Sequence, residues 1–472
     1  MEFVNHTPFP ALAFEGVDQH DQQFHVVVLR QTFDLTEDGP LYADEQSPLS
    51  VEDTWFGEPG RSGVREESDL CQFKPKCDVI VNGAAYSPAS RAMGRFRVGL
   101  VVRAPDAPER ALPASPQGLN PLLPPSPAAM AQWEQECAAV RGVTQSGVTL
   151  IDKVLDVTGE RVLVRSAFAT SWLARICRGL TLGLMRPVPW SLSRPVPCRS
   201  IPLRPELAFG GECRVSAGSP VAARVPQRHR FPDAQGDMGP VAHTAFPENP
   251  IGAGWSEGWY LDAAQIKTLK APQFEWPDAP FDLSVFEQAI SGRPLPKQQR
   301  VACLGVRAKG HPERAKLVGT IDESFVASSR WLPDDFDFSV WNAAPPDQQI
   351  AYPQGAEVFE LTNLFPADAT GVTLDDQGNS MMRFALPEHL AFVRVRLESG
   401  AWFRLPMNID TVSIDTERRQ LCLVWRRIVA KTREAPIRVL EAGILSAAQR
   451  RERERLFTEF DAQARRMEAR YA

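Results

Sequence analysis

The stretch GWSEG, from Gly254 to Gly258, matches the G-x-S-x-G pattern in which a serine acts as a nucleophile. That pattern requires a strand directly before it, so that the serine stands exposed on a strained strand-to-helix turn. Here PENPIGAG precedes it, which is typical of a loop, and the histidines that could serve as a base, His311 and His389, have no supporting sequence context. We interpret GWSEG as a Gly-rich loop, and a hydrolase centred on Ser256 remains the alternative.

The best metal-ligand grouping is Cys213, His229 and His243, whose spacings match no established ligand pattern. We interpret it as a loop cysteine and surface histidines. AFGGE at 208–212 is Gly-rich, but no helix or lysine follows that could hold a phosphate, so it predicts a tight turn where backbone approaches backbone. The sequence contains no H-E-x-x-H, P-loop or dinucleotide fingerprint. We therefore predict no metal and no cofactor.

Paired carboxylates occur in WLPDDFDFSVWNAAPPDQQI at 331–350, and such pairs can serve as acid and base in glycosidases. The carboxylates are Asp334, Asp335 and Asp337. Polar and apolar residues alternate from Asp335 to Val340, a period of two that predicts a strand with one solvated face. Pro345-Pro346 would end that strand. The interpretation we favour is therefore a structural one.

The composition suits a folded protein, with 43% hydrophobic and 23% charged residues among 472. A net charge of −6 makes nucleic acid an unlikely main partner, since no strongly basic face is implied. There are 41 prolines against 31 glycines. Because proline is poor in helix interiors and suits turns and strand edges, this balance favours β structure with long connections.

The eight cysteines are scattered and form no C-x-x-C pair, which favours free thiols in a reducing compartment. MEFVNHTPFP at the start has no basic and apolar signal-peptide regions. The two most apolar candidates for a membrane span are 111–133, which contains six prolines, and 166–190, which contains three arginines. We therefore predict no membrane span and a cytoplasmic location.

Alternating hydrophobicity predicts most of the chain to be strands. Residues 9–14 and 24–35 are predicted to be two strands around an acidic hairpin turn, and the second is expected to be buried on both faces. Further strands are predicted at 77–88, at 95–103, where Phe96, Val98, Leu100 and Val102 share one face, and within 148–168 on either side of a turn. Alternation resumes in 298–345 and 356–426, and 392–428 reads as three strands. A capping box at Ser446 and Gln449 begins a C-terminal helix.

The predicted fold is mainly β, with one or two antiparallel β-sandwich-like lobes, long Pro/Gly-rich loops and a C-terminal α-helix. In domain terms, residues 1–440 form the β domain. It comprises an N-terminal lobe at about 1–168 with a Pro-rich insertion at 104–147, a loop-rich connection at 169–297, and a C-terminal lobe at about 298–440. The helix takes residues 441–472.

Several stretches, in order along nearly the whole chain, resemble one bacterial family, formally a domain of unknown function. Its genes sit beside those for VgrG spike and PAAR-tip proteins in type VI secretion loci. The stretches are TPFPALAFEGVDQHDQQFHVVVLRQTFDL at 7–35, SDLCQFKPKCDVIVNGAAYSP at 68–88, TGERV at 158–162, IPLRPELAFGGE at 201–212, ENPIGAGW at 248–255, GTIDESFVASSRWLPDDFDFSVWNAAPPDQQI at 319–350, GAEVFELTNLFP at 355–366 and DTVSIDTERRQLCLVWR at 410–426.

The resemblance implies a non-catalytic adaptor or chaperone that binds a secreted effector or a PAAR-domain protein in the cytoplasm and helps to load it onto the VgrG spike. The motif residues are types that fix backbone shape and build contact surfaces. Those expected in structural turns are Phe209, Gly210, Gly211, Asn249, Pro250 and Gly252. The candidate partner-binding residues are Trp331, Asp334, Asp335, Asp337 and Trp341, although both tryptophans could equally be core residues. A weaker alternative is that the chain is itself a secreted effector.

Overall fold

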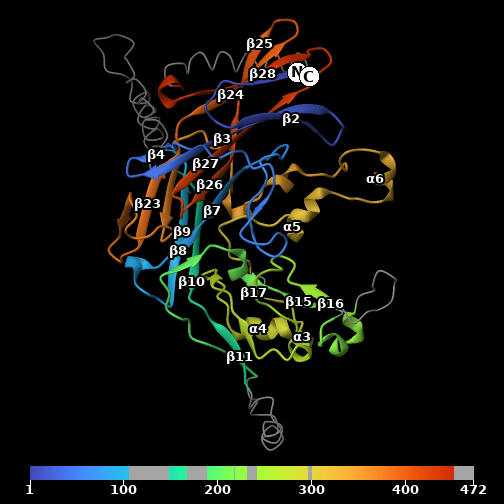
Figure 1. Ribbon diagram of the computed structural model, residues 1–472, viewed down its shortest axis with the longest axis vertical. Coiled ribbons are helices and arrows are strands. Elements are labelled where there is room, and N and C mark those ends of the chain that lie inside the picture. The colour runs from blue at the N-terminus through green and yellow to red at the C-terminus, as the bar shows by residue number, and fades with distance from the viewer. Residues whose placement is uncertain (106–147, 167–188, 217, 231–241, 296–299, 451–472) are drawn as a thin grey trace, which may run out of the picture.

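The structure is a computed structural model that describes residues 1–105, 148–166, 189–216, 218–230, 242–295 and 300–450 (Figure 1). Its largest sheet has seven strands in the order β2-β3-β27-β26-β7-β20, with β4 paired to β3. All neighbours in it are antiparallel except β26 and β7. The strands are β2 (Ala11–Val17), β3 (Gln23–Thr36), β4 (Gly39–Tyr42), β7 (Cys77–Asn82), β20 (Gln349–Ile350), β26 (Asn408–Asp415) and β27 (Gln420–Ala430).

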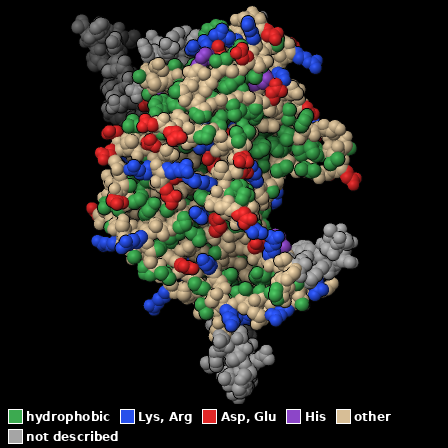
Figure 2. All heavy atoms as spheres, in the orientation of Figure 1, with side chains coloured by type: hydrophobic (Ala, Val, Ile, Leu, Met, Phe, Trp, Pro, Cys, Tyr) green, Lys and Arg blue, Asp and Glu red, His purple; other side chains and the backbone are tan. Residues whose placement is uncertain are grey.

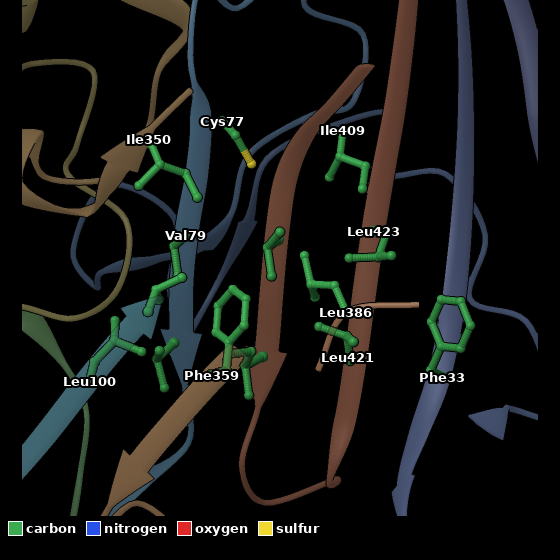
Figure 3. Close-up of a cluster of buried hydrophobic side chains, with 14 of the residues drawn as sticks. Phe33, Cys77, Val79, Leu100, Ile350, Phe359, Leu386, Ile409, Leu421 and Leu423 are labelled. Atoms are coloured by element: carbon green, nitrogen blue, oxygen red, sulfur yellow. The ribbon is translucent and has the colours of Figure 1, made fainter. Parts of the chain in front are cut away.

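A second sheet of six antiparallel strands has the order β19-β10-β9-β21-β23-β22. Its strands are β9 (Arg95–Arg103), β10 (Thr149–Thr158), β19 (Phe274–Glu275), β21 (Val358–Thr362), β22 (Val372–Leu374) and β23 (Ser380–Ala385). The apolar rows of the two sheets meet in one buried cluster. Figure 3 shows Leu100 and Phe359 from this sheet close to Val79 of the larger one.

A third sheet, β1-β28-β24-β25, closes one end of the same core. It consists of β1 (Glu2–Asn5), β24 (Leu390–Leu397), β25 (Trp402–Pro406) and β28 (Ile437–Leu445). The first strand of the chain pairs in parallel with the last described strand, β28. The two ends of the described chain are therefore held in one sheet.

A smaller, loop-rich part lies at the other end in Figure 1 and has its own core around Phe209 and Phe286. The short sheets of the protein are β11 (Val162–Arg165) with β12 (Trp190–Leu192) and β18 (Thr268–Lys270), β13 (Ser200–Pro202) with β8 (Ala84–Tyr86), β14 (Phe209–Gly210) with β17 (Ala253–Gly254), β15 (Glu212–Val215) with β16 (Ala242–Ala245), and β5 (Thr54–Trp55) with β6 (Val64–Glu66).

The helices in the described ranges are few and short. The α-helices are α3 (Gly258–Ala263), α4 (Leu283–Ile290), α5 (Pro312–Ala315) and α6 (Glu323–Ser328). The 3-10 turns are η1 (Pro88–Ser90), η2 (Pro205–Leu207), η3 (Ala222–Arg224), η4 (Gln227–His229), η5 (Lys316–Val318), η6 (Phe338–Trp341) and η7 (Pro346–Gln348). Within the described ranges, no helix is long and apolar enough to cross a membrane.

The prediction of a mainly β fold is confirmed, and several strands lie where alternation placed them. The predicted strand 95–103 is β9, and its four apolar residues face the core. The predicted strand 24–35 is the centre of β3. It is buried on both faces, because one face packs into the main core through Val27, Leu29 and Phe33 and the side chains of the opposite face are also covered. The six described cysteines are free, as the scattered spacing indicated, and Cys137 and Cys177 lie outside the described residues.

Two predictions about strands were wrong. The described part of the region 298–345, residues 300–345, contains no strand; it forms loops, α5, α6 and 3-10 turns, and the alternating residues 335–340 enter η6. Local side-chain bonds decide this, because Asp337 accepts a hydrogen bond from the Ser339 N–H at 2.8 Å and so starts a turn. The region 392–428 contains four strands instead of three, because Met407, which lies in no strand, separates β25 from β26.

The two predicted β lobes contribute strands to the same sheets. β27 pairs with β3, β26 with β7, and β21 with β9, so the shared sheets favour one β body over two lobes. The domain boundaries themselves stay a prediction, and the Pro-rich insertion lies almost wholly outside the described residues.

At the C-terminus β28 continues to Leu445, so the predicted helical segment does not begin at 441. The capping box is present, with Ser446 and Gln449 bonded to each other's backbone N–H, and residues 451–472 lie outside the described part.

A buried carboxylate holds the loop WNAAPP at 341–346, which we call the motif loop, against the main sheet. Asp78 on β7 is fully buried and accepts hydrogen bonds from the N–H groups of Ala343 (2.8 Å) and Ala344 (3.2 Å). Its remaining partners are the Asn342 side-chain amide (3.0 Å) and the ammonium of Lys74 (2.9 Å). Because a buried charge is tolerated only when it is paired and hydrogen-bonded, these four donors make Asp78 the anchor of the motif loop.

We predict that Asp78→Asn lowers the free energy of unfolding by about 3 kcal/mol or more, because it leaves the Lys74 ammonium buried without its counter-ion. The measurement is denaturant unfolding of both proteins. Asp376→Asn, at an exposed position, is the matched control and should change the stability by less than about 0.5 kcal/mol. Equal stabilities of the wild type and Asp78→Asn would show that the carboxylate does not anchor the loop.

Candidate functional site

Three of the stretches that carry the family resemblance, 201–212, 248–255 and 319–350, contribute to the wall of one cavity of about 660 Å³, a volume within the usual range for ligand sites. Its wall combines the β5–β6 hairpin, mid-β10, the Asn249-Pro250 loop, the segment 300–313 and the Pro345-Pro346 turn. Much of the wall is apolar, with Val64, Val306 and four prolines beside Trp55 and Trp276. We call this the motif cavity.

Two Gly-rich turns shape one wall of the motif cavity by packing backbone on backbone. The Asn249 amide donates to the carbonyls of Pro205 (2.7 Å) and Phe209 (3.1 Å). Gly210 has φ of +154°, and a Cβ there would lie 2.1 Å from the Asn249 carbonyl oxygen. A Cβ at Gly252 would lie 2.7 Å from the Ala208 carbonyl oxygen. Only glycine lets these turns approach, so the FGG and NPIG motifs position Pro250 at the cavity.

Lys153 projects into the motif cavity from an inward-facing position of β10, in the same row as Ile151 and Leu155. Its side chain is only 2% exposed. The ammonium donates to the Gln348 side chain (2.7 Å), pairs with Asp347 (3.0 Å) and lies 5.1 Å from the Trp276 ring centroid. Burial lowers the pKa of Lys153, and Asp347 opposes that shift.

A second cation, Arg300, also lies over Trp276, with its guanidinium carbon 4.2 Å from the ring centroid. Its carboxylate partner Asp278 is 3.5 Å away, and both side chains are more than half exposed, so this pair contributes little. A separate polar group in the wall comprises Glu248, Arg307, His311 and Glu313. There Arg307 pairs with Glu313 at 3.3 Å.

Ser256 does not line the motif cavity, and its side chain is nearly inaccessible, since the residue is 2% exposed. Its hydroxyl shares a hydrogen bond with the Cys213 thiol at 3.4 Å. Of the two candidate bases, His311 caps α5 and His389 stacks on Tyr42; no hydrogen bond from either to Ser256 occurs among the described residues. A nucleophile needs both access and a base, so this arrangement does not assemble a hydrolase triad.

The three candidate metal ligands are engaged elsewhere. Cys213 bonds Ser256, His243 lies 2.9 Å from a Glu212 oxygen, and His229 stacks on Trp259. Within the described ranges, no three His, Cys, Asp or Glu side chains gather as a metal site.

Most predicted partner-binding residues lie on a projecting segment, residues 319–337, which contains α6 and stands out from the body in Figure 1. We call it the acidic arm. It carries five carboxylates and one basic residue, Arg330. Three large apolar side chains on it are exposed: Trp331 (74%), Val326 (71%) and Ile321 (63%). Figure 2 shows the surface hollowed below the arm.

Some of the predicted carboxylates also stabilise the arm. Asp335 accepts from the N–H (2.8 Å) and hydroxyl (2.7 Å) of Thr320, hydrogen bonds that lower the pKa of Asp335. Asp337 caps η6, whereas Asp334 is exposed and pairs with Arg330. Trp341 differs from Trp331: it lies half-buried in η6 at the base of the arm.

The acidic arm rests on the turn between β2 and β3, more than 300 residues away in sequence. Gln19 donates from its side chain to the Phe336 carbonyl at 2.8 Å. Asp21 accepts from the Trp331 N–H at 3.3 Å, and Arg330 bonds the Gln19 carbonyl. Asp18 and Asp21 of this turn extend the acidic surface. Two family stretches, 7–35 and 319–350, therefore form one composite surface.

Reasoning from the sequence missed the motif cavity, because its wall comes from segments scattered between residues 55 and 347. One local signal was available. Lys153 interrupts the apolar row of a clear strand, and a lysine in such a position is rarely buried unless it is paired.

The chain belongs to the bacterial family described as "Uncharacterized protein conserved in bacteria (DUF2169)", which matches residues 20–109 and 129–426. The match covers the motif cavity and the acidic arm. No curated protein and no solved structure matches the chain.

We predict that the Lys153→Met variant folds, and that it lacks the rise in the free energy of unfolding that the wild type shows as the pH increases in the alkaline range. The lowered pKa of Lys153 means that, between this pKa and the ordinary value of about 10.4, the unfolded chain holds a proton that the folded chain has lost. Wild-type stability relative to Lys153→Met should therefore rise with pH through that window. Unfolding at a series of alkaline pH values measures the difference, and a constant difference would show that Lys153 is not perturbed.

Proposed function

We propose that this protein is a non-catalytic adaptor of type VI secretion. It binds a secreted effector or a PAAR-domain protein in the cytoplasm and assists its loading onto the VgrG spike. The observation that carries the proposal is the acidic arm, which displays three exposed large apolar side chains on a family stretch. The secretion context comes from the resemblance described above.

The arm has the features of a protein-binding surface more than of a catalytic one. Trp331, Val326 and Ile321 offer apolar contact area, and tryptophan is enriched among residues that dominate binding energy. Hydrogen bonds from Thr320, Gln19 and Arg330 hold the arm in place, which lowers the entropy lost on binding.

The charge of the surface selects the chemistry of the partner. The arm and the β2–β3 turn together carry seven carboxylates against one arginine. A partner face with lysine or arginine around an apolar centre would therefore complement it and would associate faster at low salt. A polar rim around a small apolar centre is typical of a transient interface, and this suits a client that must later be released to the spike.

We predict that Trp331→Ser with Val326→Ser weakens client binding about thirtyfold or more, because truncating central aromatic contacts typically costs about 2 kcal/mol. The measurement is affinity capture of the tagged protein from bacteria expressing the secretion locus. The client must be identified as an effector or PAAR-domain protein encoded in that locus and be lost when its gene is deleted.

The matched control is Leu374→Ser, which removes an exposed apolar side chain (51%) from β22, outside the arm. It should leave capture unchanged, as should Ser256→Ala. If no such client is captured, the adaptor proposal is wrong. If the arm variant captures the client as well as the wild type does, the assignment of the binding surface to the arm is wrong.

A further inference from the structure

The motif cavity has a cationic end that the adaptor proposal does not use. Lys153 and Arg300 both lie over the ring of Trp276, at 5.1 Å and 4.2 Å from its centroid. Lys153 is buried at a core-facing position, where methionine or leucine would avoid the desolvation of a charge. A cation kept at such a position beside an open cavity indicates a binding role as well as a structural one.

The positive charges of Lys153 and Arg300 are neutralised by neighbouring groups to different extents. Lys153 bonds Asp347 and Gln348, and the amide of Gln348 is held by the carbonyls of Val79 (2.7 Å) and Leu304 (2.9 Å). This fixes the ammonium in place. Among the described residues, the ion pair of Arg300 is with the exposed Asp278 at 3.5 Å, and the Arg300 side chain is itself about half exposed. Arg300 can therefore bind an incoming anion without first breaking a strong ion pair.

The remainder of the cavity sets the shape and charge of that anion. Trp55, Val64, Ile251 and Val306 line it with apolar surface. Asp347 already neutralises part of the Lys153 charge, and Glu248 and Glu313 line another part of the wall. A dianion such as a phosphate ester would meet these carboxylates, whereas a single negative charge would be balanced by Arg300.

We propose that the motif cavity binds a carboxylate carried on an apolar body, with Arg300 and Lys153 holding the carboxylate and the Trp55 side of the cavity covering the body. The carboxylate comes either from a free organic acid or from the C-terminal residue of a protein chain. Both sources share the chemistry that Arg300 recognises, a planar anion able to accept two parallel hydrogen bonds.

The test compares three compounds with one phenylpropyl body: hydrocinnamate, the corresponding alcohol and the corresponding amine. Binding to the full chain is followed by fluorine NMR of fluorotryptophan-labelled protein, with the Trp55 and Trp276 signals assigned by substitution to phenylalanine. We expect hydrocinnamate to shift both signals and to bind about tenfold more tightly than the alcohol. The amine should bind most weakly.

Arg300→Gln is the diagnostic variant, since Arg300 is exposed and its loss should leave the fold intact. It should lower the affinity for hydrocinnamate severalfold, because only Lys153 then remains to hold the carboxylate, and the alcohol should bind as before. Arg383→Gln, at an exposed arginine on β23, is the control and should change neither affinity. Equal binding of acid, alcohol and amine, or binding of none of them, would overturn the proposal.

A short peptide ending in phenylalanine, compared with its C-terminal amide, distinguishes the two sources of carboxylate. Tighter binding of the free-acid peptide than of hydrocinnamate indicates a chain terminus, and the reverse indicates a small acid. This inference does not depend on the adaptor function, because it is tested with purified protein and small probes. Loss of client capture without loss of carboxylate binding would affect only the adaptor proposal.

Discussion

The buried carboxylate of Asp78 is the constraint on which the functional surfaces depend. It binds two backbone N–H groups of the loop 342–344, the Asn342 amide and the Lys74 ammonium, and the residues that supply these donors are all buried. Gln348 adds bonds to the carbonyls of Val79 and Leu304. These bonds fix both the Pro345-Pro346 wall of the motif cavity and the point where the chain returns from the acidic arm.

The motif cavity and the acidic arm are continuous in the chain. Residues 306–313 line the cavity, the arm follows at 319–337, and 345–347 line the cavity again. Arg314, in α5 just before the acidic arm, is fully buried and pairs with Glu67. This ion pair connects the start of the arm to the body of the protein. The motif residues thus act largely through backbone shape: they help to form a cavity that has one cationic end, and they support an exposed apolar surface.

The sequence predicted the fold class and individual strands well, because alternation within a strand is local. β9 spans 95–103 as expected, since its apolar residues all face one core. The partners of the strands could not be predicted, because β3 pairs with β27 almost 400 residues later and no local signal encodes that pairing. The alternation at 335–340 misled for a physical reason: Asp335 and Asp337 bond nearby backbone and form turns.

The candidate site was predicted only in part. Trp331 and Asp334 are exposed on the acidic arm, and their role in partner binding stays a prediction. The cavity was missed because it depends on tertiary contacts among distant loops. Lys153 was the residue from which it could have been inferred, because a lysine in an inward row of a strand requires a buried partner.

The most direct test of this account is hydrogen exchange of the wild-type protein, followed by mass spectrometry of peptides covering 342–350 and 321–331. Asp78 and Gln348 should make the first segment exchange as slowly as the core strands, while the exposed arm exchanges quickly. Equally fast exchange in both segments would contradict the claim that a buried carboxylate locks the motif loop and supports the functional surfaces.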